Sequence, residues 1–211
     1  MPYTAKLWNQ RVRSRIDISG QITHLTRGAT SAGKELSALH VLIKILRDRK
    51  IIGSNTASGF IVGERRAVCF QDAPLYSLCQ NIDFERFLAR EQKSARVRYE
   101  PVGLMFPKPY AFGLGARPVL YKRTATAKGL LPNDEWWRIV SFDMAIQDAY
   151  VDWTHEREWR APEDFAFDIS QATVLVPNTT TFKRFFDVGR HGGEDVTGLV
   201  RTVVPLGSIY V

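Results

Sequence analysis

The chain has little cysteine and histidine: its 211 residues include two cysteines, Cys69 and Cys79, and four histidines. Two thiols cannot build the disulfide framework that is typical of small secreted domains. The cysteines and histidines are also too scattered to supply the closely spaced ligands of a structural zinc site. We therefore expect no bound metal and a reducing, cytoplasmic location.

Long apolar runs are missing as well. No stretch approaches the roughly 20 apolar residues that a membrane-spanning helix needs, and the first residues lack the apolar core of a secretory signal. We expect no membrane partner. The chain also lacks a glycine-rich phosphate loop ending in Lys-Ser/Thr and a Gly-x-Ser-x-Gly elbow, so nothing supports a P-loop enzyme or a serine hydrolase.

What the chain does have is an excess of positive charge. Lys and Arg number 29 against 22 Asp and Glu, which gives a net charge of +7, while 45% hydrophobic and 24% charged residues are ordinary for a globular protein. This balance favours an anionic partner such as nucleic acid, although an excess of this size also serves solubility alone. The contacts that we predict for nucleic acid are Arg65, Arg66, Arg96 and Arg98.

The residue pattern predicts one domain of the α+β class. Residues 1–20 are polar and basic, which predicts an N-terminal arm or a short strand. Apolar residues at steps of three and four predict a helix over 35–49, and a second helix is expected over 75–88. Strands are expected at 21–27, 67–70, 102–106, 118–121, 137–142, 173–176 and 199–204, with a loop at 28–33 and mainly antiparallel pairing.

Two short stretches offer groups that could hold a ligand. His24 and Thr26 lie two residues apart near a strand end, where an imidazole and a hydroxyl could bind the diol of a ribose. The alternative is a packed histidine bonded to a backbone carbonyl. Phe70 ends the next strand and could stack on a flat ring, or it could be a core residue before a turn.

The most informative stretch contains Glu156, Glu158 and Arg160. On a continuous strand these three side chains share one face, with the two carboxylates roughly 6–7 Å apart. One carboxylate could stabilise a cationic centre, while the other orients or deprotonates an acceptor. The alternative is a solvated ladder of ion pairs on an exposed strand edge, against which Trp153 and Trp159 argue because they favour partial burial.

Four motifs occur in an order that resembles the ADP-ribosyltransferase fold. They are His24-Leu25-Thr26, a helix containing Ile45-Leu46, the run Cys69–Leu75, and Glu156-Arg157-Glu158-Trp159. The resemblance is to the DarT-type enzymes that modify nucleic-acid bases, and to related bacterial abortive-infection and phage-defence proteins. It implies split antiparallel β-sheets with peripheral helices and an NAD cleft between the sheets.

The resemblance also implies roles. NAD would be the substrate, with His24, Thr26 and Arg27 beside its ribose and diphosphate, Phe70 stacked on nicotinamide, Glu158 catalytic and Glu156 assisting the acceptor. The partners would be nucleic acid (DNA or RNA) and, for a toxin, an antitoxin protein. The chain departs from the family where Val68-Cys69-Phe70 replaces a tyrosine-rich strand, and in offering only Arg65 or Arg66 for an upstream arginine.

A different class of function fits the same charge. The protein could be a non-catalytic module of a defence operon that binds nucleic acid or protein and needs no NAD cleft. A metal-dependent nuclease is a third reading, for which the acidic pair is too sparse.

Overall fold

The computed structural model describes residues 2–31, 33–91 and 100–209 and confirms the α+β class. Arg96 and Arg98 lie outside the described residues. The helices are α1 (Ala5–Arg13), α2 (Ala38–Asp48), α3 (Leu75–Glu91), α4 (Lys108–Gly113), α5 (Thr124–Lys128) and α6 (Thr179–Arg190), with short 3-10 turns η1 (Thr56–Ser58), η2 (Asn133–Arg138), η3 (Thr154–Glu156), η4 (Ile169–Gln171) and η5 (Leu206–Ser208).

The strands form several small sheets. They are β1 (Gln21–Leu25), β2 (Ala29–Ser31), β3 (Lys34–Leu36), β4 (Lys50–Ile51), β5 (Ala67–Phe70), β6 (Gly103–Pro107), β7 (Arg117–Pro118), β8 (Leu120–Tyr121), β9 (Ile139–Val140), β10 (Trp159–Pro162), β11 (Phe165–Ala166), β12 (Thr173–Val176) and β13 (Thr202–Pro205). The two largest sheets have the orders β1-β6-β12-β13 and β5-β10-β7. Antiparallel pairing dominates as expected, although β12 pairs in parallel with β13, and β8 with β9.

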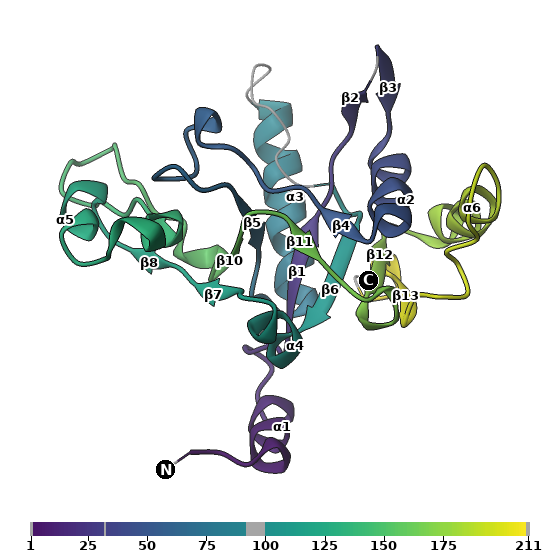
Figure 1. Ribbon diagram of the computed structural model, residues 1–211, viewed down its shortest axis with the longest axis horizontal. Coiled ribbons are helices and arrows are strands. Elements are labelled where there is room, and N and C mark those ends of the chain that lie inside the picture. Colours follow the sequence, from purple (N-terminus) through teal and green to yellow (C-terminus); the bar gives the residue numbers. More distant parts are fainter. Residues whose placement is uncertain (1, 32, 92–99, 210–211) are drawn as a thin grey trace.

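A single antiparallel bridge joins the two sheets. The N–H of Thr23 donates to the carbonyl of Gln71, and the N–H of Gln71 donates back to Thr23, each at 2.8 Å. β1 and β5 therefore lie side by side at this point before the sheets part (Figure 1).

The four-stranded sheet is buried on both faces. Leu104 and Phe106 of β6 pack into the cluster that contains the buried face of α2, while Met105 between them packs against α3. Val174, Leu175 and Val176 of β12 divide in the same way, because successive side chains of a strand point to opposite faces. A continuous apolar run is the sequence pattern that such doubly covered strands require.

Three predicted boundaries differ from the structure. The helix expected over 35–49 begins at Ala38, because residues 34–36 pair with 29–31 as a hairpin inside the expected loop. The strand expected over 137–142 shrinks to Ile139–Val140, since Trp137 belongs to η2. The N-terminal arm is helical: Thr4 caps α1 by accepting a hydrogen bond from the N–H of Leu7 at 3.3 Å.

Candidate active site

The segment with the two glutamates is not a continuous strand, which corrects the prediction that Glu156, Glu158 and Arg160 share one face. Glu156 ends η3, and Arg157 then adopts a left-handed backbone with φ 44°. Strand β10 begins only at Trp159. Because the left-handed residue breaks the alternation, the pairing that survives is between Glu158 and Arg160.

Glu158 and Arg160 form a buried ion pair with two contacts. Arg160 Nε donates to one carboxylate oxygen of Glu158 at 2.7 Å, and Nη2 donates to the other at 3.2 Å. The remaining guanidinium nitrogen donates to the carbonyls of Trp137 and Ile139 at 2.9 and 3.1 Å. With Glu158 6% and Arg160 3% exposed, the alternative of a solvated ladder on an exposed edge is wrong.

Two weakly acidic groups border this pair and stay neutral. Tyr121 Oη accepts the N–H of Glu158 at 2.7 Å, and burial together with the Glu158 charge raises the pKa of Tyr121 to about 12. Burial and the same charge also raise the pKa of the Cys69 thiol. Because nucleophilic attack needs the thiolate, Cys69 is not an activated nucleophile.

Glu156 is held close to the end of β5. Its side chain is 9% exposed, and its backbone carbonyl accepts the N–H of Asp72 at 3.0 Å. The Asp72 carboxylate in turn pairs with Lys108 Nζ at 2.7 Å. The segment before Glu158 is therefore fixed to both β5 and the start of α4.

His24 lies on the opposite side of β5 from this pair. Its Nδ1 is 2.9 Å from the carbonyl of Cys69, which can only accept, so Nδ1 carries the proton. Burial lowers the pKa of His24, so the imidazole is neutral. Its Nε2 is then an acceptor, and that nitrogen makes no hydrogen bond with any residue that the structure describes. Since Cys69 pairs with Arg160 in β10, His24 and the Glu158–Arg160 pair flank the same residue of β5.

Thr26 and Phe70 belong to the core, which corrects their predicted contacts with a ligand. Thr26 is 3% exposed, and its hydroxyl lies 3.1 and 3.3 Å from the carbonyls of Val102 and Ala38. It thereby ties the end of β1 to the start of α2. Phe70 is 1% exposed, and its ring meets the edges of buried aromatic rings, so it has no free face for nicotinamide.

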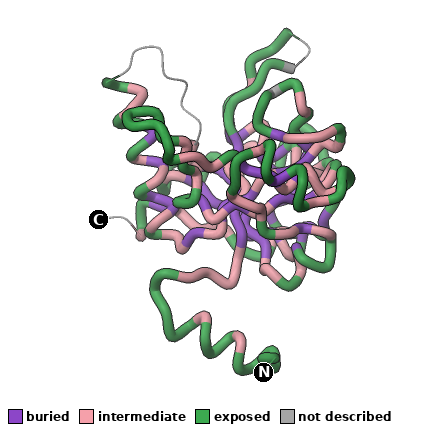
Figure 2. The backbone as a smooth tube through the Cα atoms, turned by 90° about the vertical axis from the view of Figure 1, so that its left-hand side faces the viewer, coloured by how far each residue is buried: buried purple, intermediate pink, exposed green. Residues whose placement is uncertain are grey.

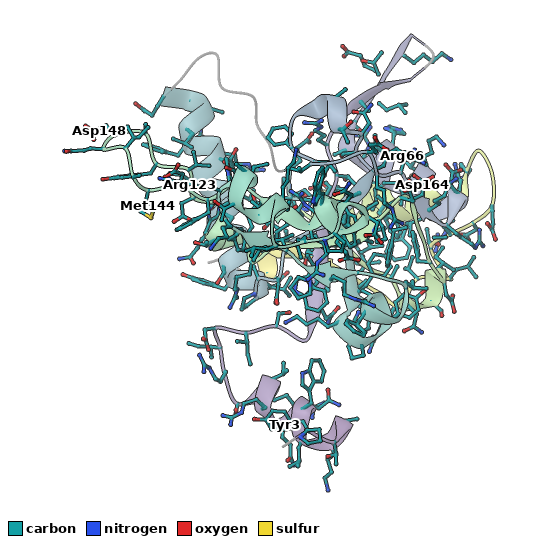
Figure 3. The ribbon with its side chains drawn as sticks, turned by 60° about the vertical axis from the view of Figure 1, so that its left-hand side comes forward. Tyr3, Arg66, Arg123, Met144, Asp148 and Asp164 are labelled. Carbon is teal, nitrogen blue, oxygen red and sulfur yellow. The ribbon has the colours of Figure 1, made fainter. Side chains whose placement is uncertain are left out.

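The predicted arginines fall in different surroundings. Arg27 is exposed just after β1. Arg65 pairs with Glu163 at 3.2 Å, and Arg66 pairs with Asp164 at 3.2 Å. Arg66 and Asp164 lie together in Figure 3. Both arginines are therefore partly neutralised by acidic neighbours, which weakens their predicted attraction for phosphate.

Tyr121 is the residue of this site that sequence reasoning missed. It is distant from Glu158 in the chain, and it sits in a two-residue strand whose pattern carries no sign of the contact. Among residues 2–31, 33–91 and 100–209 there is no cluster of His, Cys, Asp and Glu able to hold a metal ion. None of the described helices is long and apolar enough to span a membrane.

Comparison of the chain with protein-family models, with curated proteins and with solved structures yields no significant match in any of the three. The candidate site is therefore interpreted from its own geometry and from the motifs of the sequence.

Proposed function

We propose that the protein is an NAD-dependent ADP-ribosyltransferase that releases nicotinamide and modifies a nucleic-acid base, acting as a toxin or anti-phage defence effector. One observation carries the proposal: His24 and Glu158, named from separate motifs, flank Cys69 of β5 where the two sheets part. The split sheets with peripheral helices support the same proposal.

His24 suits a contact with a ribose hydroxyl. A neutral imidazole whose Nδ1–H is fixed on the Cys69 carbonyl presents Nε2 in one orientation, as an acceptor for a hydroxyl proton. The exposed Arg27 lies beyond it on the same chain segment and offers a cation to a diphosphate. In this proposal Thr26 supports the strand and does not touch the substrate.

Glu158 would act on the charge that develops as nicotinamide leaves. The bond between the ribose C1′ and the nicotinamide nitrogen breaks, and the ribose takes on positive charge that a nearby carboxylate stabilises. Each carboxylate oxygen has a second lone pair, so Glu158 can accept a ribose hydroxyl while it stays bonded to Arg160. Arg160 is then a positioning residue that fixes the carboxylate.

The acceptor would be a nitrogen of an unpaired base, which attacks C1′ and releases a proton toward Glu156. An unpaired base is favoured because a base within a duplex must first be flipped out of the stack. Glu156 lies two residues before Glu158, and η3 holds it next to Asp72.

The test is nicotinamide release from NAD, measured with and without a pool of RNA and DNA. Glu158→Gln should lower turnover by about 10²–10³ because it removes the charge that acts in the transition state. Glu163→Gln is the matched control, since Glu163 is an exposed glutamate that pairs with Arg65. Glu156→Gln should reduce labelling of the nucleic acid more than cleavage of NAD.

A second pair of variants keeps the test decisive if Glu158→Gln unfolds. His24→Ala should weaken NAD binding in calorimetric titration, whereas Thr26→Val should leave it unchanged, because its hydroxyl faces two backbone carbonyls. Wild-type protein that is folded by circular dichroism and neither binds NAD nor releases nicotinamide would overturn the proposal.

A second candidate is a non-catalytic module that binds nucleic acid or protein. The observation that favours it is the complete satisfaction of the Glu158–Arg160 pair by hydrogen bonds within the protein. Such a pair can serve the fold alone. Wild-type turnover of Glu158→Gln, with nucleic-acid binding retained, would favour this candidate.

A further inference from the structure

A groove of about 1030 Å³ lies between α1 and the body of the protein, away from His24 and Glu158. Its inner wall is the start of β1 and the residues around α4, and its outer wall is α1. Figure 2 shows α1 projecting from the body as a largely exposed arm. The arm residue Tyr3, labelled in Figure 3, is 56% exposed.

One face of α1 is turned to this groove. Positions 5, 8, 9, 12 and 13 line it, which is the spacing of a single helical face. Trp8 and Val12 approach Gly20, where an added Cβ would lie 3.6 and 3.4 Å from them. A residue without a side chain at position 20 therefore allows the arm to fold back toward β1.

The groove combines aromatic rings with cations. Tyr3 and Trp8 come from the arm, and Phe112, 49% exposed, comes from α4. Arg13 and Arg201 supply positive charge from the arm and the body, and neither side chain forms an ion pair or hydrogen bond with another described residue. None of the described residues that line the groove is acidic.

We propose that this groove binds a single-stranded segment of nucleic acid. Phosphates would contact Arg13 and Arg201, and bases would stack on Trp8 and Phe112. Aromatic platforms beside unpaired cations are the combination by which proteins bind single strands without reading their sequence. The arm adds to the attraction, since Lys6, Arg11, Arg13 and Arg15 outnumber its single acid, Asp17.

The groove is tied to the segment that carries the two glutamates. Arg157, which lies between them, donates from Nη1 to the carbonyl of Asp17 in the arm at 2.6 Å. From the other wall, the N–H of Lys108 donates to Gly20, and its ammonium group pairs with the Asp72 that holds Glu156. This proposal rests on the proposed function, because a bound single strand would run from the groove toward those glutamates.

The experiment is fluorescence anisotropy with labelled oligothymidylate and oligouridylate of about 12 nucleotides, in the absence of NAD. Arg13→Gln with Arg201→Gln is compared with Lys183→Gln and Arg184→Gln, two exposed cations on α6. The groove pair should weaken binding and lower the slope of log affinity against log salt by about 1.4, at about 0.7 per phosphate contact. The α6 pair removes the same charge and should change neither quantity.

Aromatic variants test the stacking. Trp8→Ala and Phe112→Ala should each weaken binding by about 5- to 100-fold and leave the salt slope unchanged. Both residues lie outside the main core, so the fold should persist, with circular dichroism as the check. Competition by a duplex of the same length should be weaker than by the single strand.

Other outcomes overturn the proposal. Equal losses for the groove pair and the α6 pair would mean diffuse attraction to charge, and an absence of binding by the wild type would leave the groove without this ligand. A dimer in light scattering that Trp8→Ala dissociates would assign the groove to a second copy of the chain. Because nicotinamide release is measured without nucleic acid, failure of the groove and failure of the proposed function give separate results.

Discussion

The two main sheets bury different chemistry. In the four-stranded sheet, Leu104, Met105 and Phe106 are at most 5% exposed, and the next strand repeats this pattern with Val174, Leu175 and Val176. In the three-stranded sheet the buried groups include the Glu158–Arg160 ion pair and, beside it, the half-buried Cys69. An all-apolar sheet stabilises the fold, whereas a buried charge pair is costly to form, which makes the three-stranded sheet the place to look for function.

The largest expected effect comes from breaking the buried pair. Arg160→Met should lower the free energy of unfolding by about 3–5 kcal/mol, because it leaves the Glu158 carboxylate buried without its partner. Urea unfolding followed by circular dichroism measures this loss. Glu158→Met combined with Arg160→Met should recover most of it, since no charge then remains buried, but should abolish any transferase activity.

These two variants separate a structural pair from a catalytic one. If the double variant is as unstable as Arg160→Met, the hydrogen bonds from Arg160 to the carbonyls of Trp137 and Ile139 dominate the energetics. If it recovers both stability and nicotinamide release, Glu158 has no catalytic part.

A smaller effect is expected from His24, at the boundary between the sheets. Its pKa in the folded protein lies below the ordinary value of 6.5, so the unfolded chain takes up a proton first as the pH falls. Stability is therefore fully present above about pH 6.5 and is lost as the pH falls toward the folded pKa, by at most about 1.4 kcal/mol per pH unit. Urea unfolding of the wild type and of His24→Gln across this range measures the difference.

His24→Gln removes this titration and leaves that of every other group in place. The prediction is wrong if the two proteins lose stability in parallel as the pH is lowered through 6.5.

The smallest effect concerns the exposed pairs beside the three-stranded sheet. Arg65→Gln with Arg66→Gln should change stability by no more than about 1 kcal/mol, because exposed ion pairs gain little in water. Their binding of single-stranded nucleic acid should also fall less than that of Arg13→Gln with Arg201→Gln, in the same anisotropy titration. A larger loss from the Arg65 and Arg66 substitutions would restore them as the main phosphate contacts.

Much of the scaffold could be predicted from the sequence because it depends on local patterns. Residues 67–70 and 173–176 are strands as predicted, since short apolar runs bounded by turn residues leave few alternatives. The apolar stripe from Leu39 to Leu46 likewise fixes the buried face of α2. The start of that helix was predicted three residues early, because the β2–β3 hairpin competes for residues 34–36.

The sequence by itself determined the α+β class, the excess of positive charge, and the residues that carry chemistry, among them His24 and Glu158. Only the tertiary structure decided their surroundings: that Thr26 and Phe70 are core residues, that Arg160 neutralises Glu158, and that Glu163 and Asp164 occupy Arg65 and Arg66. The physical reason is that secondary structure follows from neighbours in the chain. Burial and charge pairing depend instead on residues far apart in sequence, and the left-handed turn at Arg157 is enough to reverse which side chains meet.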